Sequence, residues 1–81
     1  MKRVIDIGSQ WLHFKGCYIA TVIALAKHTE TGESLVIYEC YNNDTKTACG
    51  VYARPLKMFL SEVDKNKYPY AKQRYRFERV N

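Results

Sequence analysis

Residues 18–41, YIATVIALAKHTETGESLVIYECY, decide the fold of this chain. In an extended conformation, alternate side chains of residues 18–26 fall on opposite faces, and both faces are largely apolar. This pattern is typical of a strand that is central to a curled sheet or covered on both sides. The β-branched Thr21 and Val22 favour a strand over a helix. Because Gly32 allows the positive φ of a short hairpin turn, we predict a second strand over residues 34–41.

Shorter strands are predicted on either side of this hairpin. Gly8 and Gly16 bracket a short predicted strand over residues 10–14, which carries Trp11. A third long strand is expected over residues 49–54, ended by Pro55 because proline cannot donate to a strand ladder. The alternating residues 74–80 are typical of a closing strand.

One segment departs from the β pattern. In residues 55–63, Leu56, Phe59, Leu60 and Val63 have the spacing i, i+3, i+4 and i+7 of a helical face. Proline is tolerated in a first helical turn, so the segment predicts a helix of two turns or a 3₁₀ turn that plugs one end of a barrel.

From all these elements together we expect an all-β (mainly β) fold. It would be a small five-stranded SH3-like barrel with one short helix or 3₁₀ turn before the last strand. A five-stranded oligonucleotide-binding barrel is the alternative.

Length and composition limit the possible functions. With 81 residues, we expect a single domain over residues 1–81 with its core at about 8–80, too small for the two-lobed cleft of most metabolic enzymes. The apolar run at residues 4–5 is too short for a signal peptide, and residues 19–26 are too short for a membrane span. We expect a soluble, cytoplasmic protein, a monomer or weak dimer without a membrane partner.

The three cysteines, Cys17, Cys40 and Cys49, form a poor disulfide framework because their number is odd and none are close in sequence. They indicate a reducing compartment. Zinc sites usually present ligands as close pairs, and the sequence contains neither a C-x-x-C nor an H-x-x-x-H pair. We expect no metal and no cofactor.

Several motifs resemble those of a bacterial family called domain of unknown function 1653. The pattern consists of an HFKG segment at residues 13–16, an HTET segment at 28–31, an RP-x-x-MF segment at 54–59, and Arg76-Phe77. The resemblance runs from Gly8 to Val80 and implies a small SH3-type barrel without an established activity. Where a tryptophan is expected in a W-V-R-P-like segment, this chain has Tyr52, an alternative aromatic platform.

Three functional hypotheses follow from these residues. The first is a non-catalytic binding module for an unknown protein or an anionic ligand, in which polar and aromatic residues at strand ends share one rim. Cations would bind an anionic group, tyrosines would stack, and a histidine would donate or accept a hydrogen bond. The predicted ligand-binding residues are His13, Lys15, His28, Glu30, Tyr38, Tyr52 and Arg54.

The second hypothesis is binding of RNA or single-stranded DNA. The net charge is +5, and the C-terminal segment interleaves basic and aromatic residues that would neutralise phosphates and stack on bases. Its candidate residues are Lys72, Arg74, Tyr75, Arg76 and Arg79. The alternative is a solvated edge strand whose charges deter aggregation.

The third hypothesis is a small enzyme centred on His28 and Glu30, which share a face of a strand. Because we find no nucleophile elbow, phosphate loop or metal pair, we name no catalytic residue.

Overall fold

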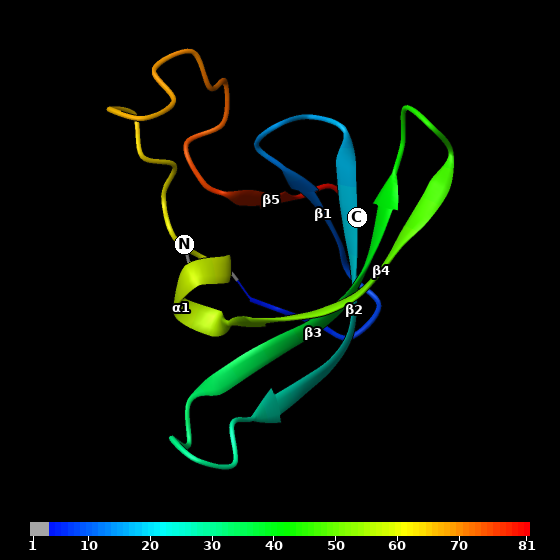
Figure 1. Cartoon of the computed structure of the whole chain (residues 1–81), viewed down its shortest axis with the longest axis vertical. Helices are drawn as coiled ribbons and strands as arrows, with labels where there is room; N and C mark the ends of the chain where they lie inside the picture. Colours follow the sequence, from blue (N-terminus) through cyan, green and yellow to red (C-terminus); the bar gives the residue numbers. More distant parts are fainter. Residues whose placement is uncertain (1–3) are drawn as a thin grey trace.

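The computed structural model describes residues 4–81 and contains one antiparallel sheet (Figure 1). The sheet has the strand order β4-β3-β2-β1-β5. Its elements are β1 (Gln10–His13), β2 (Tyr18–Lys27), β3 (Ser34–Asn42), β4 (Thr47–Pro55), the helix α1 (Leu56–Phe59) and β5 (Phe77–Arg79). The mainly β fold predicted from the sequence is confirmed. No helix within residues 4–81 is long and apolar enough to cross a membrane.

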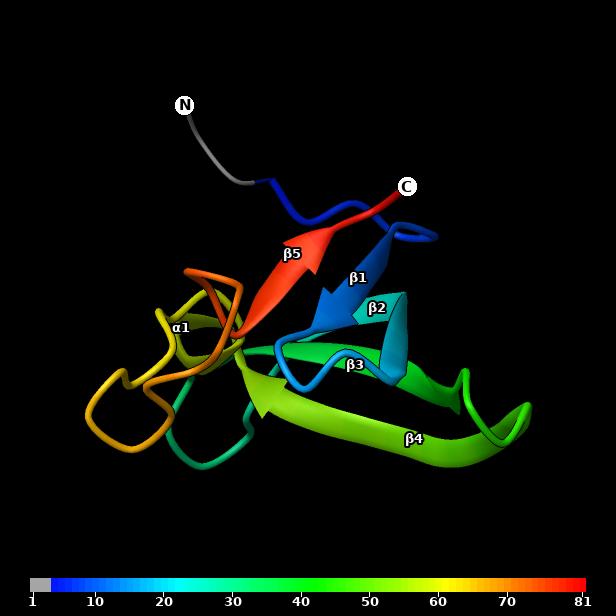
Figure 2. The same cartoon turned by 90° about the horizontal axis from the view of Figure 1, so that it is seen from above.

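The sheet is strongly curled but not closed by hydrogen bonds. Figure 2 shows β1 and β5 folded over β3 and β4, with α1 at one end. A bulge between Val22 and Ala24 bends β2, and a second irregularity opposite Cys40 and Tyr41 bends β4. Within residues 4–81 the edge strands of the sheet are β4 and β5, so the pairing describes an open, curled sheet.

The last predicted strand and the predicted helix are both shorter in the structure. Residues 74–76 leave the strand because they pair with residues 61–63 instead. The Val63 N–H donates to the Arg74 carbonyl at 2.8 Å, and the Arg76 N–H donates to the Ser61 carbonyl at 2.8 Å. This pairing between separate segments also ends the helical region, so α1 has a single turn, and Val63 is buried as part of an extended segment.

The core is an aromatic cluster between the curled sheet and α1. Phe59, fully buried, stacks on Phe77 with ring centroids 4.2 Å apart and meets Trp11 edge-on at 5.5 Å. Val22 and Val36 from the two longest strands complete the cluster. Tyr38 and Phe77, which both contact Phe59, also line a surface pocket on the other side of their rings.

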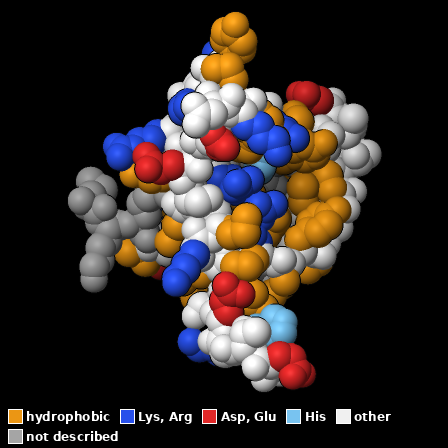
Figure 3. Space-filling view, turned by 60° about the vertical axis from the view of Figure 1, so that its left-hand side comes forward, with side chains coloured by type: hydrophobic (Ala, Val, Ile, Leu, Met, Phe, Trp, Pro, Cys, Tyr) orange, Lys and Arg blue, Asp and Glu red, His pale blue; other side chains and the backbone are white. Residues whose placement is uncertain are grey.

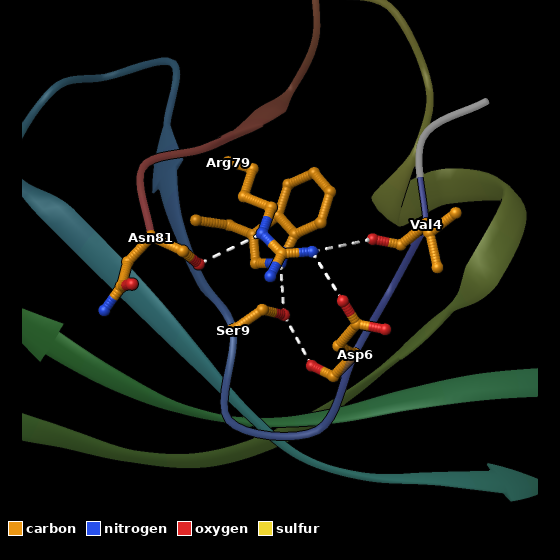
Figure 4. Close-up of polar contacts among 6 residues, drawn as sticks. Val4, Asp6, Ser9, Arg79 and Asn81 are labelled. Atoms are coloured by element: carbon orange, nitrogen blue, oxygen red, sulfur yellow. Dashed lines mark hydrogen bonds and ion pairs between the residues drawn. The ribbon is translucent and has the colours of Figure 1, made fainter. Parts of the chain in front are cut away.

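The two ends of the described chain are joined beside this core (Figure 4). The indole Nε1 of Trp11 donates to Ser9 Oγ at 2.8 Å, and Ser9 Oγ donates to the Asp6 carbonyl at 2.5 Å. Arg79 Nη1 forms an ion pair with Asp6 Oδ2 at 2.8 Å. These contacts satisfy the polar atoms next to the buried tryptophan and hold β5 against the N-terminal segment.

Candidate functional site: a cationic and aromatic pocket

A pocket of about 470 Å³ lies on the inner face of the sheet. Strand register explains its walls, because directly opposed residues of an antiparallel pair carry side chains on the same face. Ala20 is opposite Cys40, Tyr38 is opposite Tyr52, and His13 is opposite Phe77. The complete lining is His13, Lys15, Tyr18, Ala20, Tyr38, Cys40, Asn42, Thr47, Ala48, Cys49, Tyr52, Arg54 and Phe77. The lining contains cations and aromatic rings but no carboxylate.

Arg54 is the best-positioned cation of the pocket. Its Nε donates to the Tyr38 hydroxyl at 3.3 Å, and its guanidinium carbon lies 5.5 Å from the centre of the Phe77 ring. The two ion pairs within residues 4–81 join Arg74 to Glu62 and Arg79 to Asp6, so neither neutralises Arg54. A guanidinium held by a hydrogen bond and an aromatic face keeps its remaining N–H groups for an anion.

His13 is held as a neutral ring in the pocket by burial and by nearby positive charges. Its Nδ1 accepts the Lys15 backbone N–H at 3.2 Å, which leaves the proton of the neutral ring on Nε2. Burial lowers the pKa of His13 to about 4, and the charges of Arg54, Lys15 and Arg76 act in the same direction. At neutral pH this ring is therefore an uncharged hydrogen-bond donor.

Two tyrosines form an apolar wall with fixed orientation. The Tyr38 and Tyr52 ring centroids are 6.0 Å apart, and the Tyr52 hydroxyl donates to the Cys49 carbonyl at 2.9 Å. Gly50 lies under the Tyr52 ring with φ +124°, a conformation that side chains disfavour. About half of the Tyr52 side chain is exposed, so one part of its ring is available to a ligand.

The Cys40 thiol on the pocket wall is held in the protonated state. Cys49 is the extra residue of β4 opposite Cys40 and Tyr41, which brings it beside Cys40. Burial, together with the Cys49 thiol, raises the pKa of Cys40 to about 11. Within residues 4–81 no group of three or more His, Cys, Asp or Glu side chains is arranged to hold a metal ion.

The structure brings together five of the seven predicted ligand-binding residues, namely His13, Lys15, Tyr38, Tyr52 and Arg54. His28 and Glu30 are elsewhere, in the β2–β3 turn at the opposite end of β2 (Figure 1). There His28 Nδ1 accepts the Glu30 backbone N–H at 3.1 Å. The ring of His28 thus braces the turn, as that of His13 braces the β1–β2 turn.

Sequence reasoning missed several other residues of the pocket. Phe77 and Tyr18 were recognised as strand residues, but their place in the pocket depends on long-range pairing. Asn42, Thr47 and Cys49 come from the ends of the β3–β4 hairpin. The available signal was the hairpin itself, because residues flanking its turn must lie opposite each other.

The C-terminal residues of the nucleic-acid hypothesis are largely engaged within the fold. Arg74 pairs with Glu62 at 2.7 Å and Arg79 pairs with Asp6 at 2.8 Å. Arg76 Nε donates to Ser61 Oγ at 3.2 Å, and Tyr75 is partly buried, whereas Lys72 is exposed. Arg74 and Arg79 therefore have carboxylate partners within the fold, whereas Arg54 takes part in neither of these ion pairs.

Fold and site together define a small, mainly β protein with a cationic and aromatic pocket on a curled sheet. The model of the family described as Protein of unknown function (DUF1653) matches residues 9–79, and the chain belongs to this family. The family resemblance noted from the sequence motifs is thus confirmed. Comparisons with curated proteins and with solved structures find no match to this chain.

Proposed function

We propose that this protein is a non-catalytic binding module whose pocket takes a ligand with an anionic group. The observation that carries the proposal is Arg54, a partly buried guanidinium aimed by Tyr38 and Phe77 in a pocket without a carboxylate. Placing such a cation without a neutralising partner has an electrostatic cost, which an anionic ligand would offset.

The remaining lining suits the rest of such a ligand. Lys15 adds a second cation, and neutral His13 offers Nε2–H to an oxygen. Tyr38 and Tyr52 provide an aromatic surface for an apolar or planar part. A volume of about 470 Å³ is in the range of small-molecule sites.

Binding is a better account of this pocket than catalysis. The histidine in it has a pKa of about 4, far from the value near 7 that makes an efficient general base. The thiol of Cys40 has a pKa of about 11, so it is not an activated nucleophile at neutral pH. His28 and Glu30, the pair of the enzyme hypothesis, are exposed in a turn outside the pocket.

An NMR titration of the labelled protein tests this proposal. Inorganic phosphate and uridine monophosphate should shift the resonances of pocket residues, whereas neutral uridine should shift them at least tenfold more weakly. Arg54→Gln should abolish the response to both anions and keep the dispersed spectrum of the fold. Arg74→Gln is the matched control, since it removes an equal charge outside the pocket. If Arg54→Gln and Arg74→Gln respond alike, the pocket is not the anion site.

A further inference from the structure

A second hollow adjoins the pocket and changes what the ligand could be. Its volume is about 310 Å³, and its lining includes Phe14, Lys15, Lys67, Tyr68 and Tyr70. Lys15 lines both hollows, so the HFKG turn is the ridge between them. The second lining also lacks a carboxylate. Figure 3 shows basic side chains gathered beside hydrophobic ones on one face of the molecule.

Aromatic rings continue across this ridge. The His13 ring, in the pocket, lies 4.5 Å from the Phe14 ring, and Phe14 meets Tyr68 edge-on at 4.9 Å. The ammonium groups of Lys15 and Lys67 lie 6.0 and 5.8 Å from the Tyr68 ring centre. Tyr70, next in this row, is 95% exposed. A surface that alternates cations with exposed rings is suited to phosphates alternating with bases.

Resting on the proposed function, we infer that the ligand is a single-stranded polynucleotide that crosses the HFKG turn. One nucleotide occupies the pocket, with its phosphate on Arg54 and its base against Tyr38 and Tyr52. Lys15 binds the next phosphate on the ridge, and the following base stacks on Tyr68 or Tyr70. These residues differ from Arg74 and Arg79 of the C-terminal segment, whose charges are paired with Glu62 and Asp6 within the fold.

Two physical arguments favour this ligand over a single small anion. A mononucleotide would leave the second hollow and the nearly fully exposed Tyr70 without a role. The chain carries a net charge of +5, which attracts a polyanion more strongly than a monoanion. Duplexes are not expected to bind, because their stacked bases cannot reach two separate aromatic hollows.

Fluorescence anisotropy with labelled single-stranded octanucleotides, of RNA and of DNA, tests the inference against uridine monophosphate as an unlabelled competitor. We expect the better octanucleotide to bind at least tenfold more tightly than the mononucleotide, because a further base stacks on a second ring. If Lys15, Arg54 and Lys67 each contact one phosphate, the plot of the logarithm of affinity against the logarithm of salt concentration should have a slope of about −2. The RNA and DNA arms identify which polynucleotide is preferred.

Variants of the second hollow separate this inference from the proposed function. Tyr70→Ala and Lys67→Gln should each weaken octanucleotide binding about tenfold and leave mononucleotide binding unchanged. The controls are Tyr41→Ala, on the outer face of the sheet, and Lys57→Gln, on α1. Equal affinity for octanucleotide and mononucleotide would overturn the inference and leave the anion pocket standing. Equal binding of a duplex, or of polyphosphate of the same charge, would also overturn it. Absence of binding by every anion would overturn both proposals.

Discussion

His13 is a sensitive residue of the pocket, because burial lowers its pKa and the positive charges around it act in the same direction. A lowered pKa means that the folded protein binds the His13 proton less readily than the unfolded chain, whose histidines titrate near 6.5. The unfolded state therefore gains a proton as pH falls below about 6.5, and the folded state does so only near 4. The contribution of His13 to stability is complete above this window and is lost as pH falls through it.

This linkage predicts how the free energy of unfolding depends on pH. Between pH 7 and pH 4.5, the wild-type protein should lose more stability than His13→Asn, whose side chain can still accept the Lys15 N–H but does not titrate. Because the ring is only half-buried, solvent screening reduces the size of the difference. Urea unfolding at the two pH values measures it. Parallel pH profiles for the two proteins would show that His13 is not held neutral by its surroundings.

His28 occupies a similar position at the opposite end of β2, yet it lies outside the pocket. Its Nδ1 accepts the Glu30 N–H, and its carbonyl accepts the Gly32 N–H, so the ring and backbone fix the hairpin turn. His28→Ala should lower the free energy of unfolding by about 1 kcal/mol, the typical worth of one hydrogen bond. Ligand affinity should not change. Titration and urea unfolding measure both quantities. A loss of affinity without a loss of stability would show that His28 contributes to ligand binding.

At the scale of elements, the β-bulges shape the pocket. The extra residue in β4 is followed by Gly50, whose φ of +124° bends the strand beneath the Tyr52 ring. Gly32, in the β2–β3 turn, also has positive φ, 73°, but lies far from the pocket. Gly32 is therefore a control for Gly50, because both glycines have a positive φ but only Gly50 lies beside the pocket.

Alanine at either position should destabilise the fold by about 1–3 kcal/mol, because a side chain disfavours positive φ. Only Gly50→Ala should also weaken ligand binding, since it displaces the bulge that carries Tyr52. Thermal unfolding and ligand titration of both variants check this prediction. Equal affinities of Gly50→Ala and Gly32→Ala would mean that the bulge does not position the binding surface.

The strands themselves were predictable from the sequence, and their pairing partly so. The alternation of residues 18–26 and the turn at Gly32 identify β2 and β3, since local patterns fix both. The short β5 was overestimated because Arg74 and Arg76 pair with residues 61–63, a contact between distant segments that periodicity does not contain. For the same reason, His28 and Glu30 were grouped with the pocket although β2 holds them at its other end.

The whole molecule explains why a chain of 81 residues can keep a pocket of this size. Its sheet is curled but open, and α1 closes one end by inserting Phe59 against Phe77 and Trp11. The contact of Arg79 with Asp6 holds β5 in place beside this plug. The pocket therefore lies directly against the core, because Tyr38 and Phe77 contact Phe59 on one side and line the pocket on the other. Residues on or next to strands β1 to β5 contribute to this one surface.

The titration of the His13 ring in the presence of an anion tests the central claim most directly. The chemical shifts of the ring are followed by NMR from pH 3 to pH 8, with and without saturating uridine monophosphate. In the free protein the pKa should be about 4, held down by burial and by Arg54 and Lys15. A phosphate bound at Arg54 should raise that pKa toward its ordinary value, because it offsets the positive potential. An unchanged His13 pKa at saturating mononucleotide would contradict an anion site in this pocket.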